Sequence, residues 1–215
     1  CLTHPFLDWQ TSYAIQLFSP LSDRWFHNDS LFIVDPWILF GLGFAIWLSR
    51  RRETRGEVRW RLPAVIAAVA LALYISANGA ISALARRAVE TGKPHARPDA
   101  IVASPPPVIF WQRDLIWRED HGIWRGRFDP FHALDDLVSY SGPEPDGMTN
   151  PLARRVLFTA AGLAHFRRWS ILPMASLERG RCSVTIDYQD ARFGSRPGTG
   201  RLGQSVTVPT GAPGC

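Results

Sequence analysis

The chain has 215 residues, enough for one or two ordinary domains, with a formal net charge of +5 and a sequence pI near 9.6. A basic balance is typical of nucleic-acid-binding proteins only when the basic residues form a patch on a folded domain. Here they are densest between two apolar runs, at Arg50, Arg51, Arg52, Arg55, Arg59 and Arg61. This placement argues against nucleic acid as a partner and favours a membrane protein, although mean hydropathy over the whole chain is only −0.06.

The first residue is Cys1, and the sequence shows none of the charged, apolar and cleavage regions of a secretory signal peptide. A lipidated mature N-terminus also begins with cysteine, but Leu2 to Pro5 is not the small, polar tether that usually follows it. We therefore expect the sequence to be a piece of a longer chain. Leu2 to Phe18 predicts a helix, either the end of a span or an interfacial helix, because polar residues interrupt its apolar pattern.

The strongest membrane signal is Leu62 to Ala85, a run of 24 residues without a charge. A helix of that length, at about 1.5 Å per residue, exceeds the roughly 30 Å hydrocarbon core of a bilayer. Asn78 and Gly79 lie in its second half, where we expect a packed neighbouring helix to accommodate them.

A second apolar run, Leu31 to Leu48, is interrupted only by Asp35. Asp35 followed by Pro36 is typical of a helix N-cap and first helical residue, so Asp35 is either a cap or a functional carboxylate. Including the residues before the cap gives enough length for a span, with Trp37 and Trp47 near opposite interfaces. The two runs together predict two or more transmembrane helices.

The orientation follows from the loop 50–61, which carries six Arg and two Glu between the two predicted spans. The positive-inside rule places this loop in the cytoplasm, so residues 1–35 and those after 86 lie on the opposite side. In a bacterium that side is the periplasm, where disulfides form. The sequence therefore predicts a multi-pass protein of the bacterial inner membrane, with the lipid bilayer as a partner and a periplasmic C-terminal domain.

Residues 91–215 predict a small, soluble α+β domain that follows the membrane α-helical region, residues 1–90. Its predicted elements are, in chain order, a Pro-rich connection (91–107), a hairpin (108–118 and 123–128), a loop (141–151), a helix (152–169), a strand (182–188), a Gly-rich turn (194–204) and a strand (205–208). Cys182 and Cys215 either pair in the oxidising compartment or remain free thiols near a frayed end.

Chemistry is most strongly indicated by His4 and Asp8, which are four residues apart and would share one face of a helix. An imidazole and a carboxylate placed in this way can bind one divalent metal ion, and we expect zinc. Placing either group in or near a bilayer costs free energy, so their presence there indicates a function. The metal would acidify a bound water to give a hydroxide nucleophile. Two ligands are too few for a site, and the alternative is a simple ion pair at a helix end.

A second polar group precedes the first span on the same predicted side and contains Asp23, His27, Asp29 and Asp35. His27 and Asp29 could supply ligands or a base, and Asp23, His27 and Asp35 are the candidate catalytic residues. The alternative is an interfacial loop whose polar groups are satisfied by water. Four scattered histidines have no ligand spacing to one another and are interpreted as ordinary residues: His95, His121, His132 and His165.

Several short pieces of the sequence resemble one family. They are HPFLDW (4–9), Thr11-Ser12-Tyr13, Gln16-Leu17, Pro20, Ser22-Asp23-Arg24 and LFIVDP (31–36), followed by a span and an Arg-rich loop. This order is similar to that of the bacterial inner-membrane metal-dependent hydrolases (YdjM-like). Ser104-Pro105 and Asp190-Ala191-Arg192-Phe193 also resemble that family, so the resemblance covers most of the chain and is sharpest in residues 1–40.

The resemblance implies that His4 and Asp8 are the last pair of a larger metal-ligand set whose other members would lie upstream of Cys1. It implies a membrane-bound, metal-dependent hydrolase, incomplete in this chain and acting on an unknown substrate, with the periplasmic domain capping or shaping the site. The alternative function is a non-enzymatic, membrane-anchored envelope or interaction protein, in which the β-containing domain is the working part.

Overall fold

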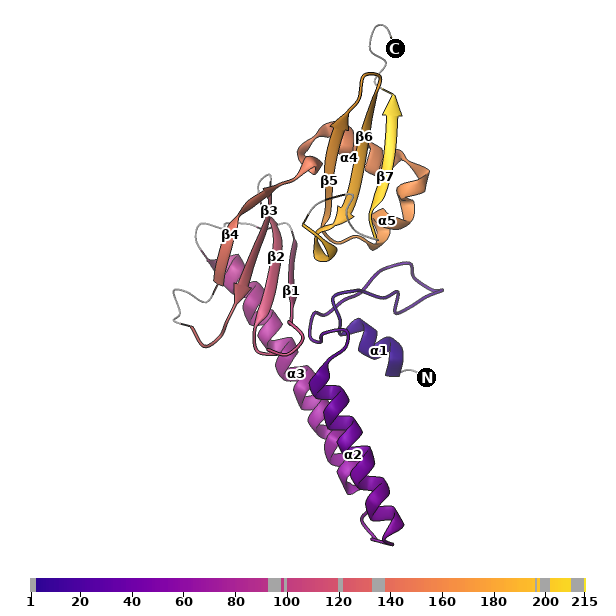
Figure 1. Cartoon of the computed structure of the whole chain (residues 1–215), viewed down its shortest axis with the longest axis vertical. Helices are drawn as coiled ribbons and strands as arrows, with labels where there is room; N and C mark the ends of the chain where they lie inside the picture. The colour runs from indigo at the N-terminus through magenta and orange to yellow at the C-terminus, as the bar shows by residue number, and fades with distance from the viewer. Residues whose placement is uncertain are drawn as a thin grey trace.

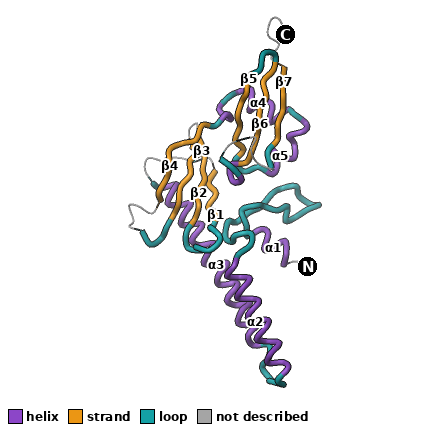
Figure 2. The backbone as a smooth tube through the Cα atoms, viewed as in Figure 1, coloured by secondary structure: helices purple, strands orange, loops and turns teal. Residues whose placement is uncertain are grey.

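A computed structural model describes residues 3–92, 98, 100–119, 122–132, 138–195, 197, 202–209 and 215. A long helical hairpin projects from a body that contains two small antiparallel sheets (Figure 1). The backbone tube in Figure 2 shows that loops connect the start of the hairpin to the short N-terminal helix beside it. Two of the histidines interpreted as ordinary residues, His95 and His121, lie outside the described residues.

The N-terminal helix α1, Thr3–Trp9, is shorter than the helix predicted from Leu2 to Phe18. The hydroxyl of Thr11 donates to the carbonyl of Asp8, and the backbone of Ala14 adopts a positive φ of 67°. A non-glycine residue in that region cannot continue a right-handed helix. The segment after Trp9 therefore runs as turns and loops, with one isolated bridge between Ile15 and Phe26.

The hairpin consists of α2, Pro36–Thr54, and α3, Leu62–Thr91. Asp35 caps α2 by accepting hydrogen bonds from the backbone N–H groups of Trp37 and Ile38, at 3.0 and 3.1 Å, which confirms the predicted cap. Among the described residues, α3 is the one helix that is long and apolar enough to cross a bilayer. The charges that begin at Arg50 leave α2 without an apolar window of the same length.

Most of the hairpin surface is bare and apolar. In α2 only Ala45 and Ser49 are buried, and in α3 the buried residues before Asn78 are limited to Pro63. Large exposed apolar side chains cover the rest: Trp37, Leu39, Phe40, Phe44, Ile46, Trp47, Leu62, Val65, Ile66, Val69 and Leu73. Water-soluble monomers rarely expose a continuous apolar surface beyond a few hundred Å².

The second half of α3 packs against the first sheet, which has the strand order β1-β2-β3-β4. These strands are Ala100–Ser104, Arg113–Glu119, Gly122–Phe128 and Val138–Pro145, and all neighbours are antiparallel. Alternate residues of β2 are buried, as expected for a strand with one covered face. Ala85 and Val89 of α3 pack there with Leu115, Trp117 and other side chains of the sheet.

The second sheet has the strand order β5-β6-β7, with strands Pro173–Arg179, Ser183–Asp190 and Gln204–Pro209. Helices α4, Pro151–Thr159, and α5, Ala164–Trp169, cover one face and form a core with it (Figure 1). A smaller apolar cluster joins the two sheets, and contains Val102, Ile123, Leu172, Met174 and Ala191.

The predicted hairpin is confirmed as β2 and β3, but residues 108–112 form a loop rather than strand. The predicted helix 152–169 is two helices, because Ala160 has an extended backbone at φ −73°, ψ 117°. The predicted strands near 182–188 and 205–208 are present as β6 and β7. Strands β1, β4 and β5 were not predicted. Strand β1 is short and lies in a Pro-rich stretch, whereas β4 and β5 themselves contain prolines and charged residues.

Cys182 and Cys215 form a disulfide, which decides between the two alternatives left open by the sequence. The bond holds residue 215 beside the start of β6. Its presence requires an environment in which thiols oxidise.

We expect both cysteines to resist alkylation in full-length protein purified without reductant, because a disulfide sulfur is not a nucleophilic thiolate. Reductant should make both reactive, as counted by mass spectrometry in a Cys1→Ser background. Alkylation of Cys182 and Cys215 in the absence of reductant would contradict the pairing.

Candidate functional site

His4 and Asp8 face one another on α1, with His4 Nε2 and Asp8 Oδ2 separated by 3.1 Å. Both are exposed, at 81% and 47% of their side-chain surface. No group of three or more His, Cys, Asp or Glu residues within the described part of the chain is arranged to hold a metal. Since a zinc site needs three or four ligands, these residues do not by themselves fit a complete site.

The three predicted catalytic residues belong to three different networks. Asp23 is exposed and forms a surface ion pair with Arg168 at 3.4 Å. Asp35 caps α2 with one oxygen and accepts from the hydroxyl of Tyr74 with the other, at 2.9 Å, so it also ties the two helices together. His27 interacts with Asp29, and this pair leads into a buried hydrogen-bond network.

Asp29 is fully buried and lies where the N-terminal loop, α3 and β1 meet. Its Oδ1 lies 2.9 Å from His27 Nδ1. Its Oδ2 accepts from the backbone N–H of Ala103 at 3.2 Å and from the guanidinium of Arg86 at 3.3 Å. The backbone of Asp29 has a φ of 57°, a conformation that Asp tolerates better than most residues and that the surrounding contacts must hold.

The charge of Asp29 is stabilised in its buried position. Burial alone raises the pKa of this carboxyl, but hydrogen bonds and charge from His27, with hydrogen bonds from Ala103 and Ser12, bring the pKa below its ordinary value of 3.8. Asp29 is therefore ionised at neutral pH. The interactions that stabilise its charged form also join the N-terminal loop to α3 and β1.

The network continues through the backbone of Asp29 to a buried arginine. Ser82 of α3 donates to the Asp29 carbonyl at 2.6 Å and accepts from Arg113 Nε at 2.7 Å. Arg113 also donates to the carbonyl and the side-chain oxygen of Asn78 at 2.7 and 2.9 Å. We call His27, Asp29, Asn78, Ser82, Arg86 and Arg113 the junction network.

Arg113 has no exposed surface, and burial lowers its pKa to about 10, which leaves it charged at neutral pH. Its remaining donors are taken by the carbonyls of Phe110 and Gln112. A buried guanidinium is stable only when its donors are paired, so Arg113 fixes α3 to the first sheet.

Asn78 and Gly79 are accommodated by a strand and a loop rather than by the neighbouring helix that the sequence suggested. A Cβ atom on Gly79 would lie 3.2 Å from the hydroxyl of Ser30, so the loop approaches the helix closely at this glycine. Asn28 holds that loop by donating to Gln10 and Ser30.

A second buried carboxylate, Asp190, connects the second sheet to the N-terminal segment. It accepts from the hydroxyl of Ser170, from the N–H groups of Ile171 and Leu172, and from Arg192. Arg192 in turn donates to the carbonyl of Ser12. Burial raises the pKa of Asp190, yet bonds and charge from Arg192 with the bond from Ser170 lower it overall.

Sequence reasoning found His27 and Asp29 but missed Arg113. The alternation of buried and partly exposed residues along β2 could have indicated that Arg113 is buried, because it lies on the same face of the strand as Leu115 and Trp117. Chemically, a carboxylate on Nδ1 orients an imidazole as in a general base. Here Asp29 also has partners in α3 and β1, so the His27–Asp29 pair serves first to join the N-terminal loop to these two elements.

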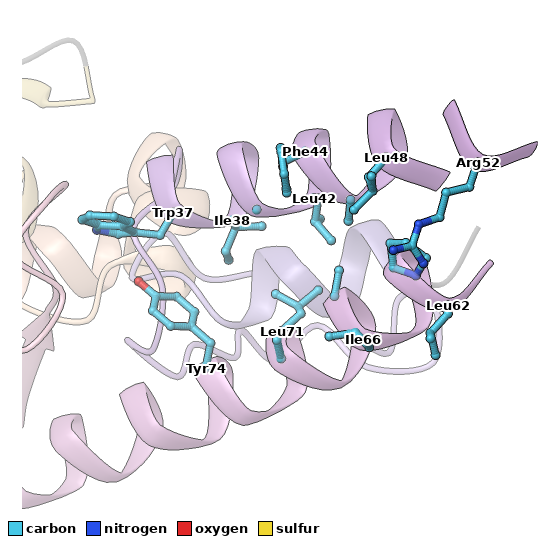
Figure 3. A pocket seen from close by; sticks show the side chains of 15 residues that line it. Trp37, Ile38, Leu42, Phe44, Leu48, Arg52, Leu62, Ile66, Leu71 and Tyr74 are labelled. Atoms are coloured by element: carbon cyan, nitrogen blue, oxygen red, sulfur yellow. The ribbon is translucent and has the colours of Figure 1, made fainter. Parts of the chain in front are cut away.

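A wide apolar groove of about 530 Å³ runs between α2 and α3. Figure 3 shows Trp37 and Tyr74 at one end and Arg52 with Leu62 at the other. The side chains between them are apolar, among them Ile38, Leu42, Ile66 and Leu71. The groove therefore follows the bare part of the hairpin and ends at its arginine-rich tip.

Replacing Asp29 by Asn should lower the free energy of unfolding by about 2 kcal/mol, the scale of the charged hydrogen bonds it loses. Because the pKa of Asp29 is lower in the folded chain than its ordinary 3.8, the contribution is full at neutral pH and is lost as the pH falls below that value. Denaturation of detergent-solubilised protein at several pH values measures the difference.

The matched control is Asp23→Asn, which removes an exposed carboxylate from a surface pair and should change stability little. Equal effects of the two substitutions at neutral pH, or a difference that does not shrink in acid, would contradict the assigned role of Asp29.

Comparison with known proteins gives one match. The model of the YdjM inner membrane protein family matches residues 1–84. No curated protein and no solved structure matches the chain. The similarity at Ser104-Pro105 and Asp190 to Phe193 lies outside the matched residues, whereas α1, the loop with His27 and Asp29, α2 and most of α3 lie inside them. Residues 1–84, less than half of this chain, are thus similar to the YdjM inner membrane protein family.

Proposed function

We propose that this chain is an inner-membrane protein in which the α2–α3 hairpin crosses the bilayer and holds a folded β-rich body at the membrane surface. The observation that carries the proposal is the bare apolar surface of the hairpin, which ends where the junction network begins. The family of residues 1–84, named for an inner membrane protein, supports the same placement.

Both helices cross in this proposal, although only α3 has the length of a span by itself. The Asp35–Tyr74 hydrogen bond ties the start of α2 to α3 at one level, so the two apolar segments run side by side from there to the tip. At the tip, Arg51 lies over the ring of Trp47 and Arg61 over that of Trp60, as arginines at an interface can.

The orientation proposed from the positive-inside rule puts the tip in the cytoplasm and the body in the periplasm. The disulfide between Cys182 and Cys215 supports this orientation, because disulfides persist in the periplasm and are rare in the cytoplasm. The body then works as an anchored envelope or interaction domain, the alternative that the sequence left open.

Topology reporters test the proposal. Alkaline phosphatase, which folds only in the periplasm, should be active when fused after Cys215 and inactive when inserted after Gly56 in the tip loop. A fluorescent protein that matures only in the cytoplasm should give the opposite pattern. Phosphatase activity at both positions would reject the two-span hairpin, and exchanged activities would reverse the orientation.

A metal-dependent hydrolase is the second candidate, favoured by the single observation that His4 and Asp8 meet on one face of α1. The described residues supply two donors, so this candidate needs ligands from elsewhere in the protein.

Metal analysis of the full-length protein separates the two candidates. Under the hydrolase proposal, stoichiometric divalent metal should copurify and should be lost in His4→Ala and Asp8→Ala. His165→Ala is the matched control, because this histidine packs against Trp25 and is no candidate ligand. Absence of metal from the unmodified protein would reject the hydrolase and leave the anchored domain unaffected.

A further inference from the structure

An exposed apolar collar lies beside the point where the hairpin enters the body. We define the collar as Ile33, Val34, Val108, Ile109 and Phe131, all of which are exposed, with Phe131 at 80%. Ile33 and Val34 immediately precede the Asp35 cap of α2. Val108 and Ile109 belong to the β1–β2 loop, and Phe131 belongs to the turn after β3.

The collar is fixed to the hairpin by specific contacts. The indole N–H of Trp37 donates to the carbonyl of Val108 at 2.9 Å. The ring of Phe110 packs edge-on against both Trp37 and Tyr74, with centroids 6.3 and 5.4 Å apart. Trp111 then connects Phe110 to Phe131, at 5.3 and 6.3 Å. A continuous row of rings therefore leads from the helices to the outer edge of the collar.

The turn that presents Phe131 is also held in place. Asp129 accepts from the backbone N–H of Phe131 at 3.0 Å and from the side chain of Gln112 at 2.7 Å. Three prolines, residues 105–107, precede Val108 and restrict the β1–β2 loop. The exposed side chains of Val108, Ile109 and Phe131 are thus carried by backbone that is already held in place.

Length gives an independent reason for the collar. The charge-free part of α2, residues 36–49, has 14 residues and is about 21 Å long at 1.5 Å per residue. The bare part of α3, residues 62–77, has 16 residues and is about 24 Å long. A hydrocarbon core is about 30 Å thick, so these two segments fall short of it by about 6–9 Å. The rest of α3 has the length to reach further, but its Ala85 and Val89 are packed against the first sheet.

We propose that the collar is a lipid-contacting surface: Val108, Ile109 and Phe131, with Ile33 and Val34, insert into the leaflet from which the hairpin emerges and supply the missing apolar depth. This inference rests on the proposed membrane anchoring. The occupant is lipid because the collar is continuous with the hairpin surface and lies at the level that the bilayer must reach. The first sheet is thereby held next to the membrane, with β5, β6 and β7 farther from it (Figure 1).

Photo-crosslinking in lipid tests the collar. The photoreactive analogue p-benzoylphenylalanine replaces one phenylalanine at a time in the full-length chain, at Phe131, Phe44 or Phe158. All three are exposed, at 80%, 62% and 65%, so the substitution disturbs packing little. The protein is placed in nanodiscs of phosphatidylethanolamine and phosphatidylglycerol with a radiolabelled acyl chain and is irradiated.

Position 44 on the hairpin and position 131 on the collar should both form labelled lipid adducts, while position 158 on α4 should give only background. Adducts at 44 without adducts at 131 would overturn the collar and leave the anchoring intact. No adduct at either position would overturn both, and equal adducts at all three would overturn the collar as the specific lipid contact of the body.

Discussion

The arrangement of the body on its helices depends on the buried charge of Asp29. A carboxylate removed from water is tolerated only when its oxygens are paired, and Asp29 draws its partners from the loop, from α3 and from β1. The same residue accepts from Ser82 through its carbonyl. Removing any of the three segments would leave a buried charge uncompensated, so their relative positions are specified together rather than one by one.

Arg113 marks the level at which α3 changes its surroundings. Before Asn78 the helix exposes Val65, Val69 and Leu73, and from Asn78 onward its buried residues face the first sheet. One continuous helix is thus bare and apolar in its first half and part of the core in its second. A rigid connection of this kind transmits the position of the hairpin directly to the sheet.

Sequence patterns predicted those elements whose formation depends on residues close together in the chain. The Asp35-Pro36 cap, the charge-free run of α3 and the β2–β3 hairpin each follow from residues close together in the chain. Sequence patterns did not predict elements whose own residues have low strand propensity and which form because a neighbouring strand pairs with them. Strand β4 contains Gly142, Pro143 and Pro145, and it forms because it pairs with β3, so its sequence alone reads as a loop.

The sequence by itself determined that the chain has apolar helices joined by a basic loop, followed by a region with strands, because charge, periodicity and capping act over a few residues. It also identified His27 and Asp29 as a pair. Only the tertiary structure decided what that pair does, since Ala103 is 74 residues from Asp29 and Arg113 is 35 residues from Asn78. Partners at such separations are brought together by the path of the whole chain, which no local pattern records.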